Sequence, residues 1–565
     1  MKEDMLPEIA YRKAASIEVP FIPHGSTIEV RYEGPKPETK TLKRGTVFIE
    51  GGRPLPCDIL WERDVEVELR DGTKIYLDIF RPPGVSDIPA ILAWSPYGKI
   101  IPSPPPPGVP VEWVSGLQKF EGPDPAYWCN HGYAVINVDV RGAYGSEGDI
   151  HFWGSVDAKD GYEVIEWVAN RDWCNGKVVM SGNSWLAIAQ WFIAAENPPH
   201  LAAIAPWEGW TDFYRADVLR GGILNVGFCE MVLSELRGRN RVEDIPYMAQ
   251  RYPLMNPYWE DKSAKLERIT VPAYVVASWT NPIHSWGTLE GFRRISSKEK
   301  WLRVHNTNEW YDYYTPENVE DLRRFFDYYL KGIENDWPKT PKVRLCILDP
   351  GGTDIINRPE NEWPLARTQY RKLFLDAATG TLSPNPIPKE SFIKYRADDG
   401  KSKAEFTMTF NEDTEVTGYL KLHLWVEAEG AMDMDLFVLV QKLDAKGDPL
   451  IQPTGIFPYL GPTGWLRVSH RELDPDRSTP WMPYHTHRTE QLLKPGEIVS
   501  CDILIWPVGM LWHKGQKLRL TIAGFNPVPS IRPEIPGPKT RNQGYHIIHT
   551  GGKFDSYLQI PVIPS

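Results

Sequence analysis

The sequence lacks three features that would place it in whole classes of protein. It has six cysteines in 565 residues and no Cys-x-x-Cys pair, which favours buried free thiols over zinc ligands or a disulfide framework. No run of about 18 apolar residues occurs, so we expect no membrane-spanning helix and no membrane partner. Clusters of lysine and arginine are also missing and the net charge is -11, which argues against a nucleic-acid partner. We therefore predict a globular, cytoplasmic protein.

Signals for metals and cofactors are missing as well. The histidines of the C-terminal part show neither i, i+4 helical spacing nor cysteine partners, so we predict no metal ion. No glycine-rich phosphate loop follows a predicted strand, so we predict no cofactor. Aromatic residues, in contrast, are abundant, with 23 tryptophans and 25 tyrosines. They indicate an aromatic pocket for a small-molecule substrate or large apolar contact surfaces, including those of a possible homodimer.

The order of strand-like and helix-like segments predicts several domains. Residues 1–60 are mixed and turn-rich, and we treat them as an N-terminal extension. Short apolar runs alternate with amphipathic helical segments over residues 61–210 and 269–340, which is typical of a parallel α/β sheet. Residues 211–268 are helical and aromatic, as expected for a cap insertion. Residues 341–565, which include KVRLCIL, consist of short strands between turn residues and predict an all-β, jelly-roll-like sandwich.

Within the predicted α/β domain, we expect the active site at the stretch VVMSGNSWLAIAQW. An apolar run ends at Gly182-Asn183-Ser184, and a helical run follows at once. A strand, a sharp turn and a helix in this order form the nucleophile elbow G-x-S-x-G, in which small residues flank the serine because the turn is strained. The match is partial, since only Ala187, one position late, replaces the second glycine. On these residues alone, a structural turn and a nucleophile are equally good interpretations.

Further motifs make the chain similar to a known family. They are SPYGK from Ser95, DVRGAYGSEG from Asp139, IEWVANRDWCNGKVVMSGNSW from Ile165, SHREL from Ser469 and KGQKLRLTI from Lys514. In this order they resemble the cocaine esterase, α-amino-acid ester hydrolase and X-prolyl dipeptidyl peptidase family. The resemblance implies an α/β-hydrolase core with a helical cap and a C-terminal sandwich. It also implies Ser184 as nucleophile, with the Tyr97 hydroxyl and the Trp185 amide as oxyanion donors.

The resemblance also predicts where the other members of a catalytic triad should lie, and there the sequence departs from it. Where the family has an aspartate after the strand that follows the insertion, the chain has Asn281. Where the family has a histidine after the next strand, the chain has Glu309. Asparagine carries no charge to steady an imidazolium, and a carboxylate at its ordinary pKa is a weak base toward serine.

Three interpretations of the site remain open at this point. In the first, His284 or His305, from the same two loops, is the base, and an acid such as Asp212 carries the charge. In the second, Glu309 is itself the base, with a pKa raised by burial among aromatic residues and a hydrogen bond to Asn281. In the third, the site no longer hydrolyses its ligand.

Two functions follow from these interpretations. The first is a serine-dependent acyl hydrolase that cleaves an ester or amide of a hydrophobic small molecule through an acyl-enzyme. The second is a non-hydrolytic enzyme of the lyase, isomerase or cyclase type, or a binding protein on the hydrolase scaffold, that uses Glu309 as base.

Overall fold

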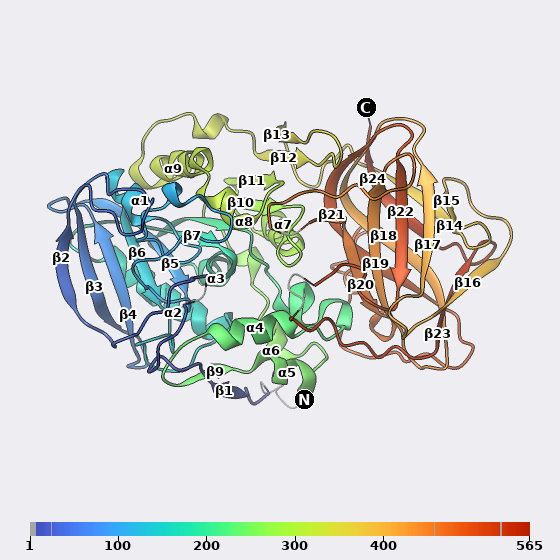
Figure 1. Cartoon of the computed structure of the whole chain (residues 1–565), viewed down its shortest axis with the longest axis horizontal. Helices are drawn as coiled ribbons and strands as arrows, with labels where there is room; N and C mark the ends of the chain where they lie inside the picture. The colour runs from blue at the N-terminus through green and yellow to red at the C-terminus, as the bar shows by residue number, and fades with distance from the viewer. Residues whose placement is uncertain (1–6, 24, 457, 531–533, 565) are drawn as a thin grey trace.

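The computed structural model describes residues 7–23, 25–456, 458–530 and 534–564, which form a large α/β unit, a helical region and a large β unit (Figure 1). The sheet of the α/β unit has the strand order β13-β12-β11-β10-β8-β7-β5-β6-β4-β3-β2. Its strands are β2 (Glu38–Leu42), β3 (Ile59–Glu68), β4 (Lys74–Arg81), β5 (Ile88–Ser95), β6 (Ala134–Asp139), β7 (Cys174–Asn183), β8 (Leu201–Trp207), β10 (Ala273–Ser278), β11 (Lys300–His305), β12 (Val343–Ile347) and β13 (Ile355–Glu360).

The centre of this sheet is parallel and buried on both faces. Strands β5 to β8 and β10 to β12 pair in parallel, whereas β2, β3, β4 and β13 are antiparallel additions at the edges. All residues of β5, β6 and β10 are buried, which explains why these strands read as continuous apolar runs. Their carboxyl ends meet at one edge, where ligands of such sheets bind.

Helices cover both faces of the sheet and create two hydrophobic cores. One core contains apolar residues of α2 (Gly154–Ala169), α3 (Ser184–Ala195) and α7 (Ser285–Arg294). The other contains those of α1 (Pro125–Asn130), α8 (Glu309–Tyr314) and α9 (Pro316–Lys331). Short 3-10 turns, η1 (Val111–Trp113) and η5 (Trp337–Lys339), lie in the connections. In the described part of the chain, no helix is long and apolar enough to cross a membrane.

The insertion after β8 consists of short elements that lie between the two sheet units (Figure 1). They are η2 (Tyr214–Val218), η3 (Arg220–Gly222), α4 (Gly227–Glu235), β9 (Arg241–Glu243), α5 (Ile245–Arg251), α6 (Pro257–Asp261) and η4 (Leu266–Arg268). The N-terminal strand β1 (Tyr11–Lys13) pairs with β9 in antiparallel register. The N-terminal segment is therefore tied to the insertion, and β2 extends the main sheet.

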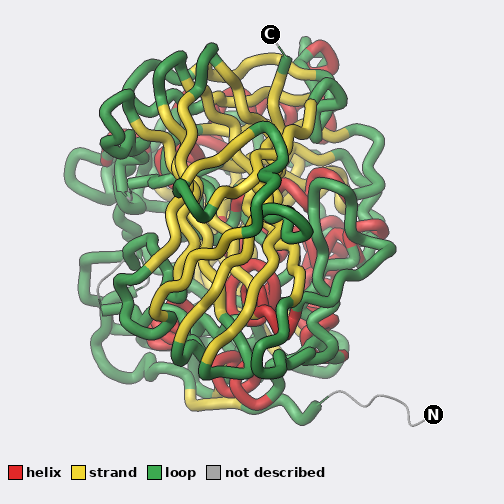
Figure 2. Tube along the Cα trace, turned by 90° about the vertical axis from the view of Figure 1, so that its right-hand side faces the viewer, coloured by secondary structure: helices red, strands yellow, loops and turns green. Residues whose placement is uncertain are grey.

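The C-terminal unit is a closed circuit of strands, which face the viewer in Figure 2. The order runs β18-β21-β20-β19-β22-β17-β15-β14-β24, and a β18–β24 pairing completes the circuit. The elements are β14 (Gln369–Asp376), β15 (Thr381–Ser383), β16 (Ser391–Arg396), β17 (Lys403–Thr409), β18 (Thr414–Glu429), β19 (Asp435–Leu443), β20 (Thr463–Arg467), η6 (Val468–His470), β21 (Val499–Trp512), β22 (Lys517–Ala523), β23 (Tyr545–Thr550) and β24 (Tyr557–Ile563). An α/β core followed by a β-rich domain is thus confirmed.

Two predicted boundaries differ from the structure. The segment KVRLCIL supplies β12, which pairs in parallel with β11, so it belongs to the α/β sheet and not to the sandwich. With β13 added, the α/β unit continues to Glu360, and the predicted boundary at residue 340 is too early. The α/β unit also begins before the predicted boundary at residue 60, because β2, which lies within residues 1–60, pairs with β3 of its sheet. A short apolar strand has the same pattern in either sheet, so its pairing partner cannot be read from periodicity.

Candidate active site

The turn that carries Ser184 has the geometry of a nucleophile elbow. Strand β7 ends at Asn183 and α3 begins at Ser184, whose φ of 49° lies in the left-handed region that serine rarely adopts. A Cβ on Gly182 would lie 2.6 Å from the Leu186 side chain, so only glycine fits there. The Ser184 amide donates to the backbone carbonyl of Glu208 at 2.9 Å. The surrounding strands thus hold a strained serine at the carboxyl edge of the sheet.

One histidine reaches the serine. His284 ends the loop between β10 and α7, and its Nε2 lies 3.2 Å from Ser184 Oγ. The ring is fully buried, and burial lowers the pKa of His284 to about 3. The imidazole is therefore neutral at neutral pH, and a nearby negative charge is needed to stabilise the imidazolium that forms when it accepts a proton. Its Nδ1 has no hydrogen-bond partner among the described residues.

Asn281 anchors the turn that presents His284. Its Oδ1 accepts the backbone N–H groups of Ile283 and His284, both at 3.0 Å. Its Nδ2 donates to Oε2 of Glu208 at 2.8 Å and to Oε2 of Glu309 at 3.0 Å. A carboxylate could make the first pair of contacts but not the second, because it has no donor. The amide is thus the group that fits between two carboxyl groups.

Glu309 lies beside the histidine and not beside the serine. It is the first residue of α8, and its Oε2 is 3.8 Å from His284 Nε2. Burial, together with the nearby charges of Glu208 and Glu121, raises the pKa of Glu309 well above its usual value. In the described part of the chain, no hydrogen bond joins Glu309 to Ser184.

Glu208 is a site residue that the sequence did not reveal. It follows β8 with a φ of 57°, and its Oε1 lies 2.5 Å from Nε2 of His305. His305, at the end of β11, is thus paired with Glu208 and does not face Ser184. Asp212 is paired elsewhere, with Arg215 at 2.8 Å. The position of Glu208 at the carboxyl end of a parallel strand was the one signal that could have identified it.

Two groups near Ser184 can donate hydrogen bonds to an oxyanion. The buried Tyr97 hydroxyl shares a hydrogen bond with the Ser184 side chain, while burial and the charges of Glu121 and Glu309 raise the pKa of Tyr97 well above its usual value. The phenol therefore stays protonated. The backbone N–H of Trp185, which follows the serine, is the second donor and points toward the carboxyl group of Glu121.

Glu121 is an ionisable residue near both donors. Burial raises the pKa of Glu121 to about 8, against the effect of a 3.0 Å hydrogen bond from Nε1 of Trp310. Oε2 of Glu121 is buried without a partner in the described structure. This carboxyl group is thus neutral over much of the physiological pH range and charged at alkaline pH.

Two adjoining cavities lie at the site. The inner pocket contains Ser184 and is lined mainly by apolar and aromatic side chains; these include Tyr97, Phe152, Trp153, Trp185, Trp210 and Phe213. The larger, outer cavity lies between the insertion, the loop of Asn281 and the C-terminal unit, and we call it the vestibule. Asp217 and Phe228 line both. The vestibule therefore adjoins the inner pocket.

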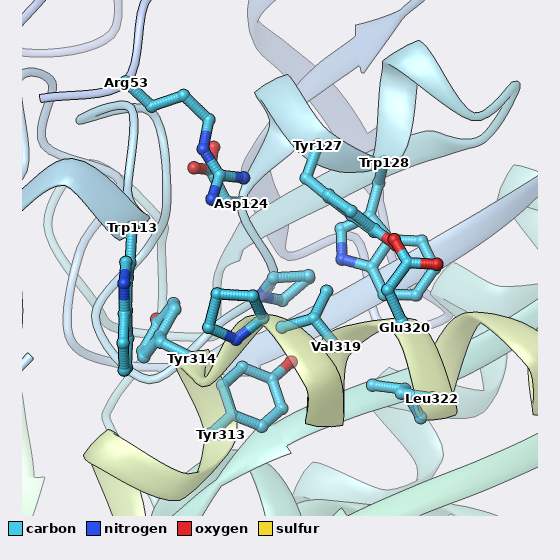
Figure 3. A pocket seen from close by; sticks show the side chains of 12 residues that line it. Arg53, Trp113, Asp124, Tyr127, Trp128, Tyr313, Tyr314, Val319, Glu320 and Leu322 are labelled. Atoms are coloured by element: carbon cyan, nitrogen blue, oxygen red, sulfur yellow. The ribbon is translucent and has the colours of Figure 1, made fainter.

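A separate hollow lies between α1 and the consecutive helices α8 and α9 (Figure 3). Ser184 is not part of its lining, which includes Tyr313 and Tyr314. The Tyr313 hydroxyl shares a 2.8 Å hydrogen bond with Ser181 of β7, and the Tyr314 hydroxyl donates to Gly122 at 2.7 Å. These bonds fix α8, and with it Glu309, against the strand that carries the serine.

No cluster of three or more His, Cys, Asp or Glu residues suited to a metal ion occurs in the described residues.

Comparisons with known proteins identify the family of this chain. The X-Pro dipeptidyl-peptidase (S15 family) profile matches residues 71–251, and that of the X-Pro dipeptidyl-peptidase C-terminal non-catalytic domain matches residues 335–559. A crystal structure of a CocE/NonD family hydrolase from Staphylococcus aureus is 36% identical, with a TM-score of 0.84 over 90% of this chain and 94% of that chain. The chain belongs to the CocE/NonD hydrolase family.

More distant relatives of this CocE/NonD hydrolase match most of its length. Cocaine esterase from Rhodococcus sp. (strain MB1 Bresler) is 22% identical, and the match covers 88% of this chain and 98% of that protein. An α-amino acid ester hydrolase has a similar fold, with a TM-score of 0.65 at 16% identity over 89% of this chain and 96% of that chain. The family predicted from the sequence motifs is confirmed, and the chain is a hydrolase of the CocE/NonD type.

Proposed function

We propose that this protein is a serine hydrolase that cleaves an ester or amide of a hydrophobic small molecule through an acyl-enzyme. The observation that carries the proposal is the 3.2 Å contact between Ser184 Oγ and His284 Nε2. A serine needs a neutral base within hydrogen-bond reach, and the imidazole is neutral and in reach. Because burial lowers the pKa of His284, the proposal also requires the Glu309 carboxyl group, 3.8 Å away, to stabilise the imidazolium.

Each step of the proposed acyl transfer can be assigned to a residue. Oγ of Ser184 attacks the carbonyl carbon as its proton passes to Nε2 of His284, and the carbonyl oxygen becomes an oxyanion. The Tyr97 hydroxyl and the Trp185 amide donate to that oxyanion. The imidazolium then returns its proton to the leaving alcohol or amine, and the acyl-enzyme forms. A water molecule repeats the sequence, loses its proton to His284 and releases the acid.

The remaining polar residues position the base and influence its charge. Asn281 fixes the backbone of His284 through two N–H contacts of 3.0 Å. The Glu309 carboxyl group, 3.8 Å from Nε2, stabilises the imidazolium when it is ionised. The aromatic inner pocket favours an apolar acyl or leaving group beside Ser184.

A fluorophosphonate probe tests this proposal. We expect one phosphonyl group per chain on Ser184, with loss of labelling in Ser184→Ala and strongly slowed labelling in His284→Gln. Folded wild-type protein that is not labelled would reject an activated nucleophile.

The second candidate is a non-hydrolytic reaction with Glu309 as base. The raised pKa of Glu309 suits proton abstraction from a ligand near His284. The Glu309→Gln variant separates the two functions. In a serine hydrolase it should slow the labelling of Ser184 only in part, because Glu309 assists His284 but does not replace it. With Glu309 as base, the variant would abolish turnover of such a ligand, whether or not Ser184 is labelled.

A further inference from the structure

Two buried residues of opposite charge face the vestibule without forming a pair. Asp217 of η2 is 1% exposed and Arg220 of η3 is 7% exposed. Both line the vestibule. In the described part of the chain, neither makes an ion pair within 4 Å. Burial raises the pKa of Asp217 and lowers that of Arg220, and the charge of each residue partly opposes this shift in the other. Because no direct contact joins the two groups, each can still bind a ligand group of opposite charge.

Asp217 lies where the two cavities join. Its Oδ1 accepts a hydrogen bond from Nδ2 of Asn225 at 3.2 Å, but its Oδ2 is buried with no partner among the described residues. Burial raises the pKa of Asp217 to about 7. Trp210, Phe213 and other aromatic side chains line the inner pocket on the same path. A free carboxylate oxygen near aromatic rings suits an ammonium group.

Arg220 lines the vestibule but not the inner pocket that contains Ser184. Its guanidinium group stacks on Trp506 at 3.9 Å and on Trp465 at 4.9 Å. Nη2 donates to the carbonyl and hydroxyl oxygens of Thr463, at 2.7 and 3.0 Å. Nε and Nη1 have no partner in the described structure. Stacking fixes the plane of the group and leaves one edge free for a carboxylate.

The two charges together specify the ligand better than either does alone. A purely cationic ligand at Asp217 leaves Arg220 unpaired, and a purely anionic ligand at Arg220 leaves Asp217 unpaired. A zwitterion pairs with both. Ser184 and Asp217 line the inner pocket, and Asp217 and Arg220 line the vestibule, so a ligand that occupies both cavities can reach all three residues.

We propose that the vestibule binds the zwitterionic leaving group of the substrate, with its ammonium group on Asp217 and its carboxylate on Arg220. This inference rests on the proposed acyl transfer at Ser184, and it narrows the substrate to an acyl ester or amide of a compound with an amino and a carboxyl group.

Four butyryl esters of similar size test the proposal. Butyrylcarnitine carries both charges, butyrylcholine only the cation, 3-butyryloxybutyrate only the anion, and 3,3-dimethylbutyl butyrate neither. Their affinities are measured by calorimetry with the Ser184→Ala variant, so that the esters bind without being hydrolysed. We expect butyrylcarnitine to bind at least about tenfold more tightly than each single-charge ester, and the neutral ester to bind most weakly. Equal affinities, or tightest binding of the neutral ester, would overturn the proposal.

Variants assign each charge to its residue. Asp217→Asn should remove the advantage of butyrylcholine over the neutral ester without weakening 3-butyryloxybutyrate. Arg220→Gln should do the reverse. If Arg220→Gln does not fold, the ligand series with the intact vestibule still decides the outcome. Because binding is measured without hydrolysis, a negative result here differs from the failure of Ser184 to react with a fluorophosphonate, which concerns the proposed function alone.

Discussion

The loop after β10 and the loop after β11 reach the same edge of the parallel sheet but contribute different groups. The first carries Asn281 and His284, and the second carries Glu309 just beyond His305. His284 lies 3.2 Å from Ser184, whereas His305 lies 2.5 Å from Glu208. One histidine thus faces the nucleophile and the other is held by a carboxylate. The loop after β10 therefore presents the candidate base, although the family pattern places the acid in this loop.

Replacing each histidine in turn tests which of the two loops supplies the base, and it has the largest expected effect. We expect His284→Gln to lower kcat/KM by about 10³-fold or more, because the proton acceptor for Ser184 is lost. His305→Gln should lower it by less than about tenfold, because glutamine can still donate to Glu208. Initial rates on p-nitrophenyl butyrate, with melting temperatures as a folding control, measure both. The reverse ranking would assign the base to the loop after β11.

The oxyanion donors give the next largest effect. Tyr97→Phe removes one hydroxyl donor and should lower kcat by about 10²- to 10³-fold with little change in KM. Tyr144→Phe is the matched control, because this buried tyrosine contacts the backbone carbonyl of Tyr97 at 3.4 Å and not Ser184. Equal losses in the two variants would show a packing effect and contradict the role of Tyr97.

The sequence predicted residues of the site but not which of them face one another. Ser184 is predicted from the elbow pattern, whereas Tyr97 and Trp185 as oxyanion donors are implied by the family resemblance. Whether His284 or Glu309 faces the serine depends on side-chain direction in a loop, which Asn281 sets through contacts with its own turn. Residue spacing carries no information about that direction.

Glu208 and the domain boundary were missed for other physical reasons. Glu208 acts through a left-handed backbone and through partners 70 to 97 residues away, and no local pattern signals such contacts. Strand β12 looks like any short apolar strand, so only its pairing with β11 shows that the α/β unit continues past residue 340. The order of domains was predictable because periodicity over long stretches differs between them.

Asn281 offers a sharper test, because the family pattern suggests that an aspartate would improve the site. We expect Asn281→Asp to lower activity by about tenfold and the free energy of unfolding by about 2–3 kcal/mol. The change removes two N–H donors and places a third carboxyl group between Glu208 and Glu309. Denaturant unfolding and initial rates measure the two effects.

The control for this change is Asn306→Asp, which loses one amide donor to Asp354, at 2.6 Å. It should lose stability but keep its activity on p-nitrophenyl butyrate. Higher activity in Asn281→Asp than in wild type would mean that the loop after β10 retains the acid position of the family pattern.

The smallest expected effect is a pH dependence that arises outside both loops, at Glu121. Its pKa is raised to about 8, so its carboxyl group is neutral below that pH and negative above it. A negative charge near Tyr97 and the Trp185 amide opposes the developing oxyanion, so kcat/KM should fall by about three- to tenfold as pH rises through 8. Glu121→Gln stays neutral and should keep its activity to higher pH, as profiles from pH 6 to 9.5 would show. An unchanged alkaline fall in this variant would exclude Glu121 as the titrating group. Glu309, whose pKa is also raised, could not replace it as the cause, because its ionisation stabilises the imidazolium of His284 and would raise kcat/KM with pH.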